Sequence, residues 1–135
     1  MTYCTRAEIA AIKRTLNQKF ATEGPDFLQL IQIDQGILKE QTTNTYFIFQ
    51  QEHQAEDILD ITRKVRENNL WANLILIGGP FDLEALLHSH LRVLSLIEGS
   101  NHSKRFDDIR IIQHQILENL KAIIEHQAPF HSFGN

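Results

Sequence analysis

Residues 70–80 constrain the fold of this chain more than any other segment. Four consecutive branched aliphatic residues, Leu74 to Ile77, are followed directly by Gly78, Gly79 and Pro80. Such a run predicts a strand over 72–77 that is buried on both faces, and the glycines and proline predict a sharp turn into a helix. A strand of this kind lies inside a sheet that helices cover, so the segment predicts a mixed α/β fold.

The first helix is expected over about residues 6–22. Thr5 and Glu8 have the spacing of a capping box, in which each side chain accepts a hydrogen bond from a backbone N–H of the first turn. Gly24 and Pro25 predict the end of the helix. The apolar residues of this segment recur at helical spacing: Ile9, Ile12, Leu16 and Phe20.

Residues 27–50 are rich in β-forming side chains and predict a three-stranded meander. A helix across 27–40 is the alternative, which Gly36 and the β-forming residues disfavour. The strands are expected at 27–33, 37–41 and 45–50, with turns at 34–36 and 42–44. In the third strand, alternation predicts Phe47 and Phe49 on one sheet face, and Tyr46 and Ile48 on the other.

A helix over 53–68 is expected to join the meander to the strand at 72–77. It is long enough for a right-handed crossover, which places that strand parallel to the third strand of the meander. Two more helices are expected, over 83–98 with Asp82 as N-cap and over 104–127, followed by a frayed tail. The inward positions of the 83–98 helix are Leu83, Leu86, Leu87, His90, Leu91, Leu94 and Ile97.

These elements predict a single domain over residues 1–135 of the mixed α/β (α+β) class. The expected sheet has four strands, an antiparallel meander plus one parallel strand, flanked by helices. The element order is α-β-β-β-α-β-α-α, and the last two helices form a C-terminal helical hairpin.

Composition narrows the function classes. The net charge is −4 and is spread evenly, with eight basic and ten acidic side chains in residues 1–67 and five and seven in residues 68–135. Strong nonspecific binding to nucleic acid is therefore not expected, although a local basic patch stays open. The N-terminus lacks the apolar core of a signal peptide, and no run approaches a membrane span. With one cysteine, the sequence predicts a cytoplasmic protein, with signal-independent export as the alternative.

No catalytic, cofactor-binding or metal site is predicted from the residues. The chain has seven histidines, but no pair has the i, i+4 spacing of a helical zinc site. His90 is the histidine expected to be buried. The turn at Gly78 and Gly79 lacks the lysine of a phosphate-binding loop, and Asp82 would compete with an anion there. Cys4 is interpreted as an incidental thiol in a mobile terminus.

The order helix, three strands, helix, strand over residues 6–77 resembles the core of the PD-(D/E)xK nuclease superfamily. That resemblance implies an acid near the second strand and an acid-x-lysine pair on the third. Asp34 matches the first acid, and Glu8 matches an acid that some members carry on the first helix. Residues 47–51 offer neither the carboxylate nor the lysine, which argues against cleavage.

The chain is also similar in size and acidity to the type III secretion chaperones, which are small dimers. Those proteins share the helix, meander and second helix, and then add two strands and a helix. The order predicted here has one strand and two helices in that place.

The last helix has apolar residues on more than one face, and surplus apolar surface is commonly a protein contact. We therefore expect a homodimer whose interface uses Ile109, Ile112, Ile116, Leu120 and Ile123. Coverage of this stripe by the 83–98 helix is the alternative.

The function expected is a non-enzymatic protein-interaction module, a regulator, adaptor or client-specific chaperone, without a cofactor. Its partners would be another protein and a second copy of itself. The alternative is a nucleic-acid-handling protein on the nuclease-like fold, using Arg63, Lys64 and Arg66, or Lys104 and Arg105. A small-molecule enzyme would need a pocket near Gly78 and Gly79.

Overall fold

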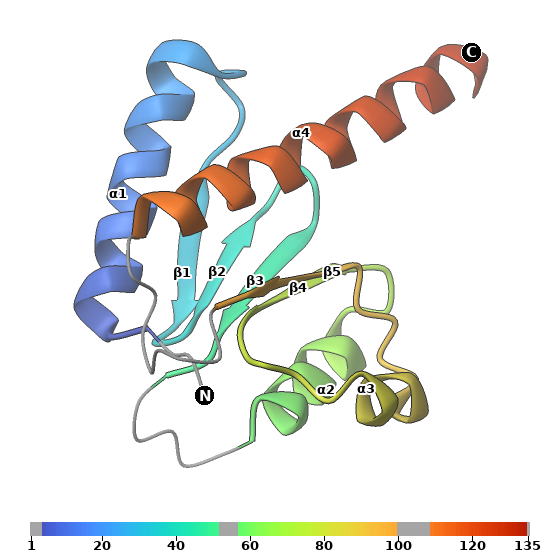
Figure 1. Cartoon of the computed structure of the whole chain (residues 1–135). Helices are drawn as coiled ribbons and strands as arrows, with labels where there is room; N and C mark the ends of the chain where they lie inside the picture. Colours follow the sequence, from blue (N-terminus) through green and yellow to red (C-terminus); the bar gives the residue numbers. More distant parts are fainter. Residues whose placement is uncertain (1–3, 52–56, 100–108, 135) are drawn as a thin grey trace.

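A five-stranded mixed sheet lies at the centre of the fold, and its strands follow the order β1-β2-β3-β4-β5 (Figure 1). The computed structural model describes residues 4–51, 57–99 and 109–134, with side chains up to His126. The elements are α1 (Arg6–Glu23), β1 (Leu30–Asp34), β2 (Ile37–Glu40), β3 (Thr45–Phe49), α2 (Ile58–Asn68), β4 (Asn73–Gly78), α3 (Leu83–Ser89), β5 (Ser95–Glu98) and α4 (Ile109–Gly134).

The first helix and the meander agree with the sequence prediction. The Thr5 backbone N–H donates to Glu8 Oε1 at 2.9 Å, and the Glu8 N–H donates to Thr5 Oγ1 at 3.2 Å, which completes the capping box. Strands β1, β2 and β3 pair antiparallel in sequence order. The segment at 27–50 is therefore a meander, and the helical alternative is wrong.

Helices cover both faces of the sheet, so β3 is buried throughout and β4 is buried from Leu74 to Gly78 (Figure 1). Phe47 and Phe49 pack with α1 and α4 in one apolar core. Tyr46 and Ile48 pack on the opposite face in a second core, to which α2 and α3 contribute. The predicted alternation along the third strand is confirmed.

Helix α2 is the crossover between β3 and β4, and these two strands are parallel as expected. The predicted start of this helix at residue 53 falls partly outside the described residues, because residues 52–56 are not described. Asp57 caps α2 through a hydrogen bond from the Leu59 N–H at 2.8 Å.

The predicted helix over 83–98 is wrong beyond residue 89. His90 and Arg92 have φ of 56° and 57°, in the left-handed region, and these values end the helix. Residues 95–98 form β5, which pairs parallel to β4. The sheet therefore has five strands instead of four, and the observed order is α-β-β-β-α-β-α-β-α. After α2, the chain contains two strands, β4 and β5, with α3 between them, and then the long helix α4.

The predicted C-terminal helical hairpin is also wrong. Helix α4 packs against α1 and against the sheet face that carries Phe47 and Phe49, instead of against α3. Its expected start at 104 lies outside the described residues, and its helical backbone continues to Gly134 instead of ending at 127. The C-terminal end of α4 projects past the sheet in Figure 1.

Candidate functional site

Glu8 and Asp34, the two acids on which the predicted nuclease resemblance rests, lie at the same end of the sheet. The Arg6 guanidinium donates to Gln35 Oε1, which ties the first turn of α1 to the β1–β2 turn. Both acids have local structural roles, however. Glu8 belongs to the capping box, and Asp34 Oδ1 accepts from the neighbouring Gln35 N–H at 2.6 Å.

The third strand does not complete that site. Phe47 and Phe49 are fully buried in the core, and Gln50 Oε1 accepts from the Gly79 N–H at 2.9 Å. Within residues 4–51, 57–99 and 109–126, no group of three histidine, cysteine or acidic side chains could hold a metal ion. The described residues therefore supply neither the acid-x-lysine pair nor a metal-binding cluster.

Glu40 is a buried carboxylate at the end of β2, where the β2–β3 turn begins. Its Oε1 accepts from the Thr43 N–H at 2.8 Å and from the Thr43 hydroxyl at 3.1 Å, and its Oε2 accepts from the Gln29 N–H at 3.1 Å. A buried carboxylate held by several donors is a turn anchor. Its contacts give it a structural role.

The turn after β4 does not leave its amides open to a phosphate. The Gly79 N–H is bound by Gln50, and the Phe81 N–H donates to Glu98 Oε2 at 3.1 Å. Asp82 caps α3 as predicted, accepting from the Ala85 N–H at 3.1 Å. Side-chain oxygens already accept hydrogen bonds from these backbone N–H groups. Two of the accepting side chains, Glu98 and Asp82, are carboxylates that would repel an anion.

His90 and Cys4 differ from expectation in their exposure. His90, the histidine expected to be buried, is exposed at the end of α3, and His88 lies beside Glu84 on the outer surface. Cys4 is instead buried, and its backbone N–H donates to Gln50 O at 2.8 Å. Cys4 is thus an ordered core residue, and its interpretation as part of a mobile terminus is wrong.

The candidate basic patch on α2 is divided by burial. Arg63 is exposed and pairs with Asp60 at 3.3 Å. Arg66 is buried, and its guanidinium donates to backbone oxygens of Ala72 at 2.8 Å and Leu91 at 2.9 Å. Burial, together with the nearby charge of Arg92, lowers the pKa of Arg66. Arg66 therefore links the loop between α2 and β4 to the loop between α3 and β5, and its guanidinium does not face a ligand. Lys104 and Arg105 lie outside the described residues.

The apolar stripe predicted as a dimer interface lies inside the single chain. Ile112, Ile116 and Leu120 are fully buried, and Ile123 is 7% exposed. Ile109 is half-buried and packs against the same core. The stripe is covered by α1 and the sheet, so the surplus of apolar surface expected at these five residues is not present on the monomer surface.

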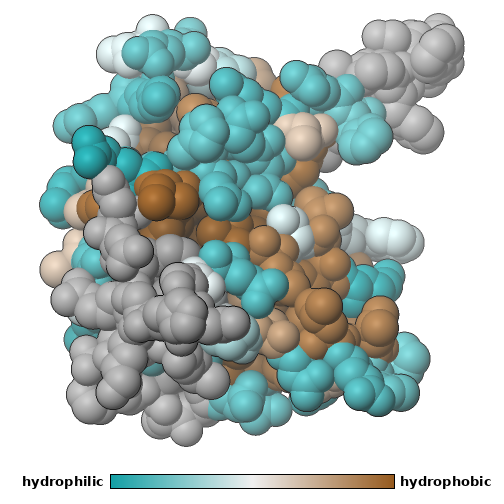
Figure 2. Space-filling view, viewed as in Figure 1, coloured by the Kyte–Doolittle hydropathy of each residue, from teal (hydrophilic) through white to brown (hydrophobic). Residues whose placement is uncertain are grey.

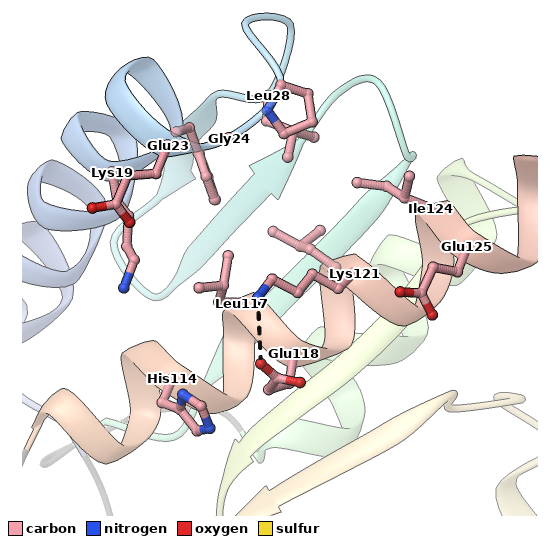
Figure 3. A pocket seen from close by; sticks show the side chains of 13 residues that line it. Lys19, Glu23, Gly24, Leu28, His114, Leu117, Glu118, Lys121, Ile124 and Glu125 are labelled. Carbon is pink, nitrogen blue, oxygen red and sulfur yellow. Dashed lines mark ion pairs between the residues drawn. The ribbon is translucent and has the colours of Figure 1, made fainter.

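A groove of about 450 Å³ lies between the end of α1 and α4 (Figure 3). Leu28, Leu117 and Ile124 supply apolar lining. Its charged lining residues have both signs, and Lys121 pairs with Glu118 at 3.7 Å along α4. The charged lining residues are Lys19, Glu23, Glu118, Lys121 and Glu125. This balanced rim favours no single class of charged ligand.

An apolar exposed surface lies on α3, β5 and the segment between them, where brown side chains gather in Figure 2. Leu83, Leu87 and Leu94 are 60%, 77% and 54% exposed. We define the β5 surface as Leu83, Leu87, Leu94, Ser95 and Leu96, which line a groove of about 650 Å³. A second groove of about 400 Å³ lies between the start of β5 and α4, with Ser95 and Ile123 in its wall.

The backbone of β5 adds hydrogen-bonding groups to this apolar surface. The Gly99 N–H donates to Gly78 O at 2.9 Å, directly after a strand whose register pairs Leu76 with Leu96. Because successive residues of a strand face opposite sides, the backbone groups of Ser95 and Ile97 point toward β4 and those of Leu96 point away. Among the described residues, no strand lies beyond β5.

A scan against protein-family models, a search of curated proteins and a search of solved structures found no match to this chain. The functional argument therefore depends on the geometry of the chain itself. Among the described residues, no helix has the length and apolarity that crossing a membrane requires.

Sequence reasoning missed the β5 surface because it placed 83–98 in one helix with its leucines inward. Leu83, Leu87 and Leu94 instead face outward. The alternation of Leu94, Ser95 and Leu96 was a β-like signal within the segment, but a helical period fitted the same residues. The observed pairing of residues 95–98 with β4 shows that this part of the segment is a strand and not a helix.

Proposed function

We propose that this protein is a non-enzymatic interaction module, a regulator, adaptor or client-specific chaperone, and that the β5 surface is its binding site. The observation that supports this proposal is a sheet edge flanked by leucines that are more than half exposed. An open edge binds an extended segment of another chain through backbone hydrogen bonds, while adjacent apolar grooves accept alternate side chains.

The chemistry of the remaining surface agrees with a binding role. Glu40, Arg66 and Gln50 are buried polar side chains whose hydrogen bonds hold turns and loops together. The leucines of the β5 surface, in contrast, contribute apolar area that the single chain leaves in water. Burying a leucine side chain completely stabilises an interface by roughly 1.5–3 kcal/mol before association costs.

Photocrosslinking in the native host tests the proposal. A photoreactive amino acid replaces Leu87 in one variant and Ile33, which is 48% exposed on the opposite edge of the sheet, in a matched control. We expect protein crosslinks at position 87 and none of comparable yield at position 33. Equal crosslinking at both positions, or none at 87, contradicts a binding role for the β5 surface.

A nucleic-acid-handling protein is the second candidate, favoured by the observed element order over residues 6–77 and by Glu8 and Asp34 at one end of the sheet. Binding of labelled DNA and RNA, followed as a function of salt, discriminates the two. Affinity that falls steeply with salt favours this candidate, because phosphate contacts release counterions. A protein-interaction module has no such binding.

A further inference from the structure

We propose that the β5 surface binds an extended segment of another protein, with apolar side chains at alternate positions and an acidic side chain at the end that lies over the start of β5. This inference rests on the proposed function and names the chemistry of the partner. The segment would continue the sheet beyond β5 through the backbone of Leu96, and its side chains would enter the grooves on the two faces of the strand.

The chain closes its other sheet edge and leaves the edge at β5 open. At β1, the Asn17 side chain donates to Leu30 O at 3.1 Å and accepts from the Leu30 N–H at 2.7 Å. At β5, the register with β4 directs the backbone groups of Leu96 away from β4. Among the described residues, no strand lies beyond β5 and no side chain holds the Leu96 backbone as Asn17 holds that of Leu30. A segment that exchanges hydrogen bonds with Leu96 therefore adds one more strand to the sheet.

The side chains of an added strand would alternate between two grooves of different chemistry, because α3 and α4 lie on opposite faces of the sheet (Figure 1). Residues directly opposite in adjacent strands present their side chains to the same face. The residue opposite Leu96 therefore points into the groove of about 650 Å³ that leucines line on the α3 side. The next residue points toward the groove of about 400 Å³ on the α4 side, where Asn73, Ser95 and Asn119 supply polar groups. A segment that fits both faces alternates apolar and polar residues.

The two grooves beside β5 contain basic residues and lack acids. Arg92 and His90 line the groove on the α3 side, and His126 lines the groove on the α4 side. None of the described residues that line either groove is an aspartate or a glutamate, although the chain carries 17 acids and a net charge of −4. Complementary charge across an interface selects the partner, so this surface favours a segment with an acidic side chain.

Arg92 is the residue that the acidic side chain would meet. Its Nη2 donates to Leu70 O at 3.0 Å, and a guanidinium has five N–H donors, so Arg92 keeps capacity for a carboxylate. The buried Arg66 guanidinium donates to Arg92 O at 3.1 Å, which brings the two arginines together. Burial, and then the charge of Arg92, lower the pKa of Arg66. A carboxylate beside Arg92 would offset this repulsion between like charges.

Peptide selection tests the chemistry of the segment. A library of random peptides displayed on phage is selected on the immobilised full chain, and the enriched sequences are read. We expect apolar residues at alternate positions, with aspartate or glutamate at one end of the apolar run. The most enriched peptide and a copy with its acids changed to lysine are then titrated against the chain. The acidic peptide should bind about tenfold or more tightly than the lysine copy.

Charge reversal tests the place of the acid. Arg92→Glu should reverse the preference, so that the lysine copy binds more tightly, and Arg92→Gln should remove the preference. Arg14→Glu, the same change at an exposed position on α1, should leave both affinities unchanged. Urea unfolding of each variant shows that it is folded. Equal binding of the two peptides to the unmodified chain, a preference for acid that survives in Arg92→Glu, or a library with no enriched peptide overturns the proposal.

Amide hydrogen exchange tests whether the selected peptide joins the sheet. The peptide should slow exchange of the Leu96 amide and leave the Leu30 amide unchanged, because Asn17 already holds the latter. A bound peptide that does not slow Leu96 lies elsewhere and overturns the proposal. A dimer on light scattering whose Leu96 amide is protected without peptide also overturns it, because a second copy then occupies the edge.

The outcomes separate the chemistry of the partner from the proposed function. If position 87 photocrosslinks to a protein in the host while the selected peptides lack acids, the acidic segment is wrong and the binding role stands. If position 87 gives no crosslink and no peptide is enriched, both are wrong.

Discussion

The two edges of the sheet carry similar side chains and differ in their backbones. On β1, Ile31 and Ile33 are 40% and 48% exposed, and on the opposite edge Leu94 is 54% exposed. At β1 the Asn17 amide satisfies the backbone of Leu30, and an irregular register ends the regular pairing. At β5 the backbone of Leu96 faces away from β4, and among the described residues no strand lies beyond it. An exposed apolar side chain therefore does not define an interface by itself, because the open backbone beside it decides whether a strand can be added.

The largest expected effect contrasts the exposed leucines beside β5 with the buried isoleucines of α4. Ile116→Asp should destabilise the chain by about 4 kcal/mol or more, because it buries an unpaired charge in a filled core. Leu87→Asp should change the stability of the monomer by less than about 0.5 kcal/mol, since that side chain is 77% exposed. Urea unfolding of both variants gives the comparison. Equal losses would mean that Leu87 belongs to the monomer core.

A smaller effect is expected when the closure of the β1 edge is removed. Asn17→Ala deletes two hydrogen bonds to Leu30 and should cost about 2 kcal/mol, because both backbone groups lose their partner. Ser95→Ala, the matched change on β5, should cost less than about 0.5 kcal/mol. Asn17→Ala should also increase self-association through β1 on sedimentation. If Asn17→Ala is neutral for both stability and association, Asn17 does not protect that edge.

Much of the fold was predictable from the sequence because local signals and tertiary packing agreed. The Thr5–Glu8 spacing predicted the start of α1, and the Leu74 to Ile77 run predicted a strand buried on both faces. Alternation predicted the two faces of β3. In each case one residue pattern fitted only one structure.

The region from residue 90 onward was not predictable in the same way. Leu91, Leu94 and Ile97 fit a helical period, yet backbone bonds to β4 place residues 95–98 in a strand. Because residues 95–98 form a strand, no long helix over 83–98 is available to cover α4. Helix α4 packs on α1 and the sheet instead, so the residues predicted as its interface lie in the monomer core. The β5 surface depends on this long-range pairing, which no local pattern specifies.

The smallest expected effect concerns the polar contacts of Tyr46 on β3 with Lys39 on β2 and with Asn69. Burial alone would raise the pKa of Tyr46, but hydrogen bonds from Asn69 and Lys39, with the Lys39 charge, lower it below its ordinary value of 10.0. The Lys39 ammonium also lies 5.0 Å from the centre of the Tyr46 ring. Lys39→Met should raise the pKa of Tyr46, as measured by phenolate absorbance in a Tyr3→Phe background.

The sign of the accompanying pH dependence follows from the lowered pKa. Tyr46 ionises more readily in the folded chain, so it adds stability above pH 10.0, its ordinary pKa, and this increment is lost as the pH falls through the folded-state pKa. The increment should be smaller in Lys39→Met. An unchanged Tyr46 titration in that variant would mean that Lys39 does not act on the phenol.

Amide hydrogen exchange at the two edges tests most directly the claim that β1 is closed and β5 receives a strand. The Leu30 amide should exchange slowly at every protein concentration, because Asn17 holds it within the chain. The Leu96 amide points away from β4, so it should exchange rapidly in the chain alone and slowly when a partner strand is bound at β5. Slow exchange of Leu96 in the chain alone, or exchange that a bound partner does not slow, would contradict the account.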